Sequence, residues 1–122
     1  MGRVMMSVSP VYYHMIINGE KRYEYRKKRC KNQITSIVLY ITRPVSKIMG
    51  EIKVGAPIVG SPEKVWHMTE KGAGISRENL FTYCGKSGTI YAYPIKEVEI
   101  YEEPRQLQDY GKKYPPQLFY YL

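Results

Sequence analysis

The chain has 122 residues, a formal net charge of +8 and 43% hydrophobic residues, with thirteen tyrosines. This length suits one domain over residues 1–122, and the hydrophobic content argues against a disordered basic protein. No apolar run approaches the roughly 18 residues that span a bilayer, so we expect a soluble, cytoplasmic protein with no membrane association.

The cysteines and histidines give no pattern of a metal site. Cys30 and Cys84 are isolated, without the paired spacing of a zinc site or the density of a disulfide scaffold. His14 and His67 have no companions at the spacing of metal ligands. We therefore expect free thiols, no metal and no cofactor.

The first half of the chain predicts a strand, a helix and a second strand. Val4 to Val8 is a short apolar run typical of a buried strand. Ser9-Pro10 opens a helix, because serine caps the first N–H groups and proline is tolerated at the first helical position. Gly19 ends that helix. Ile34 to Ile41 is rich in β-branched residues and predicts a central strand, which Arg43-Pro44 terminates.

The next segments predict one bent strand and two short helices. Glycines and a proline interrupt the apolar alternation of residues 47–59, so this extended region is expected to bend. Ser61-Pro62 repeats the helix-start pattern, and Gly72-Ala73-Gly74 ends the second helix. Ser76 caps a third helix over residues 77–83, which Gly85 ends.

The last third predicts a long strand, a surface loop and a final strand. Residues 89–101 alternate strongly, and Pro94 indicates an edge or a bulge where the face switches. Residues 106–116 are expected to form a loop, and residues 118–122 a strand that closes the sheet. This order lacks the regular βαβ alternation of a doubly wound sheet. We predict an α+β fold: a small, mixed, mostly antiparallel β-barrel with two or three short helices.

The basic residues concentrate in one stretch, residues 19–31. Residues 1–50 carry ten Lys and Arg against two Glu, whereas residues 51–122 carry nine against nine. The period of two from Arg22 to Arg26 predicts a strand with tyrosines toward a core and charges on the other side. A helix is the alternative, since Glu24 and Lys28 would pair at i,i+4, but it lacks an apolar stripe and ranks second.

This stretch also carries a motif. Gly19-x-Lys21-x-x-Glu24-x-Arg26 directly follows the predicted helix and resembles the G-x-K-x-x-E-x-R motif of the ASCH domain, the activating signal cointegrator homology domain of the PUA-like superfamily. The ending Pro115-Pro116-Gln117 is similar to the tail of small bacterial, archaeal and phage members described as predicted transcriptional regulators. The resemblance covers nearly the whole chain. It implies a β-barrel with a cleft beside the motif and a role in binding RNA or another nucleic acid.

The resemblance also implies an enzymatic alternative. One branch of the family is an acetylcytidine amidohydrolase that uses a lysine, a threonine and a glutamate. Lys21 matches that lysine, whereas Glu24 stands where that branch has threonine. Glu20 and Glu24 favour a charged Lys21, against Arg22 and Arg26. We therefore expect Lys21 to stay protonated and act as a fixed cation, with no catalytic residue unless Lys21 and Glu24 serve the enzymatic alternative.

Two interpretations of the motif remain open. Glu24 and Arg26 are two apart on the predicted strand, so they share a side and can pair, while Lys21 must reach them from the hinge after the helix. In the functional interpretation, Lys21 and Arg26 contact phosphate or a base edge, and Glu24 orients Arg26 or accepts from an exocyclic amine. In the structural interpretation, the same charges form a salt-bridge cluster that fixes the hinge.

Other basic and aromatic residues extend the candidate site. The residues after the motif are expected to contact phosphates, with a solvated loop as the alternative. Arg43 joins the same basic rim, and Trp66 is either a packed side chain or a stacking platform. The candidate nucleic-acid-binding residues are Lys21, Glu24, Arg26, Lys27, Lys28, Arg29, Lys31, Arg43 and Trp66.

Three functions follow from these observations. The leading hypothesis is a nucleic-acid-binding module with a regulatory use, for single-stranded or structured RNA rather than duplex DNA, because a small cleft suits unpaired bases. The alternative is an enzyme on RNA or a modified nucleoside, either an amidohydrolase or a nuclease, with Lys21 in its site. A sensor of a nucleotide-like ligand is the third. The oligomeric state stays open.

Overall fold

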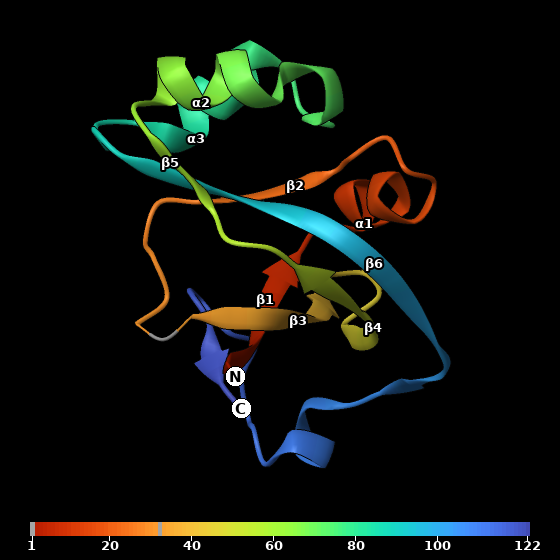
Figure 1. The fold of residues 1–122 in the computed structure, drawn as a ribbon. Helices are drawn as coiled ribbons and strands as arrows, with labels where there is room; N and C mark the ends of the chain where they lie inside the picture. Colours follow the sequence, from red (N-terminus) through yellow and green to blue (C-terminus); the bar gives the residue numbers. More distant parts are fainter. Residues whose placement is uncertain (1, 32) are drawn as a thin grey trace.

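A curled, mostly antiparallel sheet forms the frame of the protein, with helices gathered toward one end (Figure 1). The computed structural model describes residues 2–31 and 33–122. The strands are β1 (Gly2–Val8), β2 (Tyr23–Arg26), β3 (Ile34–Ile41), β4 (Lys47–Val54), β5 (Ile58–Gly60), β6 (Ile90–Arg105) and β7 (Tyr120–Tyr121). The helices are α1 (Pro10–Ile17), α2 (Pro62–Thr69) and α3 (Arg77–Cys84), with single 3₁₀ turns η1 (Glu70–Gly72) and η2 (Leu107–Tyr110).

The strand order is β2-β6-β4-β3-β1-β7, and β5 also pairs with β6. The β1–β3 pair is parallel, and the other pairs of described strands are antiparallel. The long strand β6 pairs with β2 and β5 through its first residues and with β4 through the rest. This arrangement confirms the predicted small α+β fold with a mixed, mostly antiparallel sheet.

Each helix begins where the sequence predicts. The side chains of Ser9, Ser61 and Ser76 accept a hydrogen bond from the first turn of α1, α2 and α3, respectively. Asn18 caps the end of α1, and Gly19 follows with φ +86°, a conformation that glycine adopts readily.

Several boundaries differ from the prediction. The bent region 47–59 divides into β4 and β5, and the loop after β6 contains η2. The register of β6 against β4 shifts between Lys53 and Val54, which pair with Glu97 and Ile95. The irregularity in β6 therefore lies just after Pro94, close to the expected bulge. The last strand has two residues and pairs with β1 at the edge of the sheet, so it does not close the sheet as expected.

Buried side chains form three clusters. The first packs α1 against β1 and β3, and the second packs α2 and α3 against β2, β5 and the start of β6. The third lies on the other side of β1 and β3, beneath the end of β6. Cys30 and Cys84 are buried free thiols, one in each of the first two clusters. No helix in the described ranges is long and apolar enough to cross a membrane.

Candidate nucleic-acid interface

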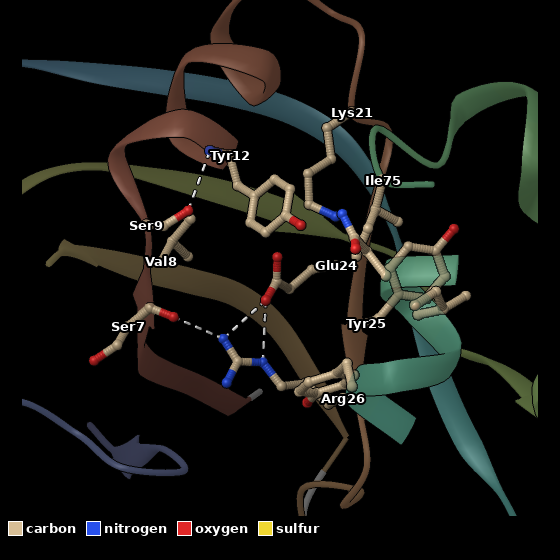
Figure 2. A pocket seen from close by; sticks show the side chains of 12 residues that line it. Ser7, Val8, Ser9, Tyr12, Lys21, Glu24, Tyr25, Arg26 and Ile75 are labelled. Atoms are coloured by element: carbon tan, nitrogen blue, oxygen red, sulfur yellow. Dashed lines mark hydrogen bonds and ion pairs between the residues drawn. The ribbon is translucent and has the colours of Figure 1, made fainter. Parts of the chain in front are cut away.

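A cavity of about 330 Å³ lies where the end of β1, α1, β2 and α3 meet (Figure 2). It contains the three charged residues of the motif, Lys21, Glu24 and Arg26. The remaining lining is mostly aromatic and small polar. The full lining is Ser7, Val8, Ser9, Tyr12, Lys21, Glu24, Tyr25, Arg26, Ile75, Asn79, Leu80 and Tyr83.

Lys21 enters the cavity from the hinge between α1 and β2, as its place in the motif predicts. Its backbone N–H donates to the carbonyl of Met15 near the end of α1, at 3.0 Å. Only 4% of the residue is exposed. The Nζ atom donates to the Ala73 carbonyl at 3.4 Å and lies 4.8 Å from the ring centre of Tyr25 and 5.2 Å from that of Tyr12. The ammonium is therefore enclosed by rings and a carbonyl, without a carboxylate in direct contact among the described residues.

Burial lowers the pKa of Lys21 below its ordinary value of 10.5. Glu24 acts in the opposite direction, and Arg26 adds to the lowering. The effects of Glu24 and Arg26 on the pKa of Lys21 have the directions expected from the sequence. The larger effect is burial, which depends on segments that are remote in the sequence. The protonated state of Lys21 stays a prediction.

Glu24 and Arg26 form a buried pair. The Nη2 atom of Arg26 lies 2.8 Å from Oε2 of Glu24, and its Nε donates to the same oxygen at 3.1 Å. Nη2 also donates to the Ser7 carbonyl at 3.0 Å, which ties β2 to the end of β1. Figure 2 shows the other carboxylate oxygen of Glu24 directed toward the middle of the cavity, near Lys21 and Tyr12. Within residues 2–31 and 33–122, no hydrogen bond ends on that Oε1 atom.

Comparison with solved structures identifies the fold. The crystal structure of ASCH from Zymomonas mobilis superposes with a TM-score of 0.88 at 22% identity, covering 98% of this chain and 87% of that chain. The chain has the ASCH fold. The N-terminal domain of Staphylothermus marinus McrB is also similar, with a TM-score of 0.52 at 12% identity over 88% of this chain and 77% of that one. The motif and the tail therefore predicted the correct fold.

Curated relatives match nearly the whole chain but are longer proteins. Large ribosomal subunit protein uL22 of Ureaplasma parvum serovar 3 is 25% identical over 120 residues, which are 98% of this chain and 39% of that protein. ATP synthase subunit alpha of the same organism is 24% identical over 120 residues, which are 15% of that protein. The chain thus spans less than half the length of either relative. No protein-family model matches it.

Aromatic residues of the cavity were not identified from the sequence as site residues. Tyr25 was expected only in the core, yet it both belongs to the second cluster and lines the cavity. Its hydroxyl lies 2.7 Å from Oγ1 of Thr69, and burial raises its pKa to about 12. Tyr12 and Tyr83 come from α1 and α3. Nothing in their spacing distinguishes them among thirteen tyrosines, because only the folded chain brings α1 and α3 to the same cavity.

The predicted phosphate contacts lie on the loop between β2 and β3. Lys27 is at the rim of the cavity, with its ammonium 4.9 Å from the ring centre of Tyr83. Lys28, Arg29 and Lys31 are exposed on the same loop and lie outside the cavity lining. We call residues 27–31 the basic loop.

Two further candidates lie apart from the cavity lining. Arg43 is exposed in the turn after β3. Trp66 is half-buried on α2 and packs against the second cluster, as its structural interpretation predicts. Among the residues that the structure describes, no group of three or more Cys, His, Asp or Glu could hold a metal ion.

Proposed function

We propose that the protein is a nucleic-acid-binding module that binds single-stranded RNA across the cavity and the basic loop. The observation that carries this proposal is the continuity between the two: one strand, β2, supplies Glu24 and Arg26 to the cavity and then runs directly into Lys27 at its rim. The cavity would take an unpaired base, and the loop would contact phosphates.

The cavity has the features that an unpaired base requires. Tyrosine rings can stack on any base, and three of them line the cavity. Oε1 of Glu24 accepts no hydrogen bond from residues 2–31 or 33–122, so it is suited to an exocyclic amine such as that of cytosine. A concave site of this size suits a single base better than a duplex groove does.

The basic loop supplies the part of the affinity that is independent of sequence. Its four cationic side chains are exposed, so each is free to meet a phosphate. The PUA-like resemblance of the ASCH fold supports RNA as the nucleic acid. One matched relative is named as a ribosomal subunit protein and another as an ATP synthase subunit, so the shared segment fits a module used in different proteins. We further propose a regulatory use in the cytoplasm.

A binding titration tests this proposal. The probe is a fluorescently labelled uridine dodecamer, followed by anisotropy at about 50 mM and about 200 mM salt. The affinity should fall at the higher salt, with a slope of roughly −0.7 in log–log form for each phosphate neutralised. Absence of binding, or binding indifferent to salt, would contradict the proposal. Tight, salt-independent binding of a free nucleotide would instead support the sensor.

A second candidate function rests on the burial of Lys21 in the cavity, which lowers the pKa of its side chain. A nucleophilic or basic lysine must lose its proton near neutral pH, and burial acts in that direction. Glu24, which opposes this effect, replaces the threonine of the amidohydrolase branch. We expect no turnover. Release of cytidine from acetylcytidine by the wild-type protein, abolished in Lys21→Arg, would establish the enzymatic alternative.

A further inference from the structure

The C-terminal segment, residues 110–122, lies beside both parts of the proposed RNA site, the cavity and the basic loop. Its strand β7 pairs with β1, with Tyr121 opposite Val4, and the two ends of the chain lie side by side (Figure 1). At one end, Oγ of Ser7 in the cavity lining donates to the Pro116 carbonyl at 2.7 Å. At the other, the backbone N–H of Lys31 donates to the Tyr121 hydroxyl at 2.6 Å. The segment therefore runs from the wall of the cavity to the end of the basic loop.

The ring of Tyr121 is held on two sides but remains accessible. The hydrogen bond from Lys31 fixes its hydroxyl, and Phe119 contacts it edge-on, with ring centres 5.3 Å apart and an angle of 65° between the planes. Phe119 in turn packs against the first cluster. Even so, 43% of Tyr121 is exposed. A ring fixed before binding loses little conformational entropy when a base stacks on it.

The charge around this ring favours nucleic acid. Lys31 is exposed and adjacent, and it continues the basic loop. Residues 110–122 contain two lysines and no acidic residue. An exposed aromatic ring next to a basic loop is an arrangement by which proteins bind single strands, with bases stacked on rings and phosphates on basic side chains.

We propose that Tyr121 is a second base-stacking site, which binds a base of the same RNA strand that occupies the cavity and the basic loop. This inference rests on the proposed function and adds to it the path of the bound RNA, which runs from the cavity, along the basic loop, to β7. Stacking requires no particular base, so this contact adds affinity without sequence preference.

The test compares single substitutions in the titration with the uridine dodecamer. Tyr121→Ala should weaken binding by roughly 5- to 100-fold, the effect typical of losing one stacked base. Because stacking releases no counterions, the salt slope should not change. Tyr121→Phe keeps the ring and loses the hydroxyl contact to Lys31, so it should retain most of the affinity. Tyr114→Ala is the matched control, since Tyr114 is 70% exposed on the same segment and should not alter binding.

The outcomes separate this inference from the proposed function. Equal losses in Tyr121→Phe and Tyr121→Ala would mean that the hydroxyl only positions the loop, which overturns the stacking site. Unchanged binding by Tyr121→Ala would overturn it as well, while RNA binding stands. No binding by the wild-type protein removes both. Should Tyr121→Ala melt earlier than the wild type, Tyr121→Leu repeats the test with an apolar side chain that cannot stack.

Discussion

The two parts of the basic stretch place charged side chains in opposite environments. Lys21 and Glu24 are 4% and 6% exposed and line the cavity, whereas the basic loop from Lys27 to Lys31 is exposed except for Cys30. Burial shifts the pKa of Lys21 and fixes the Glu24–Arg26 pair. In the exposed part, water and salt screen each charge. Net charge therefore locates a candidate interface, and burial determines which of its charged groups have a shifted pKa or a fixed ion pair.

The boundary between the two parts is the end of β2. Glu24 and Arg26 lie opposite Tyr93 and Tyr91 of β6, so the sheet holds their backbone. Beyond Arg26 the β2–β6 ladder ends, and the chain turns into the loop. We therefore expect substitutions before the end of β2 to change the free energy of unfolding strongly. Substitutions after it should change RNA binding alone.

The largest effect is expected for Glu24→Ala. It removes the carboxylate from a pair whose side chains are only 8% and 16% exposed, and leaves the guanidinium of Arg26 largely out of water. We expect a loss of about 3 to 5 kcal/mol in the free energy of unfolding, measured with urea. Glu97→Ala is the control, because it removes an ion pair to Lys53 whose side chains are 68% and 65% exposed. That loss should stay below about 1 kcal/mol. Equal small losses would show that the buried pair does not stabilise the fold.

A smaller loss is expected for Gly74→Ala, which tests how tightly Lys21 is enclosed. A methyl group at Gly74 would lie 2.7 Å from Cα of Lys21, and the backbone there has φ +63°. Positive φ and overpacking together should cost about 2 to 3 kcal/mol of unfolding free energy. Gly111→Ala shares the positive φ, at +70°, but meets nothing within 4 Å, so it should cost about 1 kcal/mol. If the two variants were equally stable, the packing around Lys21 would be looser than the structure shows.

The buried charge of Lys21 should make the stability of the protein depend on pH. Since burial lowers its pKa in the folded state below 10.5, the unfolded chain holds the proton more tightly. The cost of the buried ammonium is therefore fully present near pH 7. It disappears as the pH rises from the folded-state pKa through 10.5. Lys21→Met should gain stability relative to the wild type near pH 7, and this advantage should shrink toward pH 10.

Urea unfolding at the two pH values measures this difference directly. Lys28→Met removes the same charge from an exposed position and serves as the control. An advantage of Lys21→Met that grew with pH would contradict a lowered pKa of Lys21.

Local patterns in the sequence predicted the features that depend on interactions between neighbouring residues. The Ser-Pro pairs specify the starts of α1 and α2, because capping and proline at the first position act within one turn. Alternation placed Glu24 and Arg26 on one side of a strand, and they pair there. The same reasoning failed for β7, which is shorter than predicted and lies at an edge, because pairing between distant strands leaves no local pattern.

The environment of the site depends on contacts between segments that are distant in the sequence. Lys21 is buried by Ala73, Gly74 and two tyrosines. Ala73 and Gly74 lie far from it in the sequence, and Tyr12 belongs to α1. Spacing alone carries no information on such contacts. The sequence therefore identified the charged residues of the cavity without its aromatic walls.

The smallest effect on stability and the clearest effect on binding are expected for the double variant Lys28→Ala, Arg29→Ala. Both residues are exposed on the basic loop, so unfolding free energy should stay within about 0.5 kcal/mol of the wild type. Affinity for the uridine dodecamer should fall at low salt, and the salt slope should decrease by up to roughly 1.4, the contribution of two phosphate contacts. Lys64→Ala, Lys71→Ala removes the same charge from α2 and η1 and should alter binding much less. Equal losses in the two double variants would indicate attraction to the overall charge of the protein, and the basic loop would then not be a specific part of the interface.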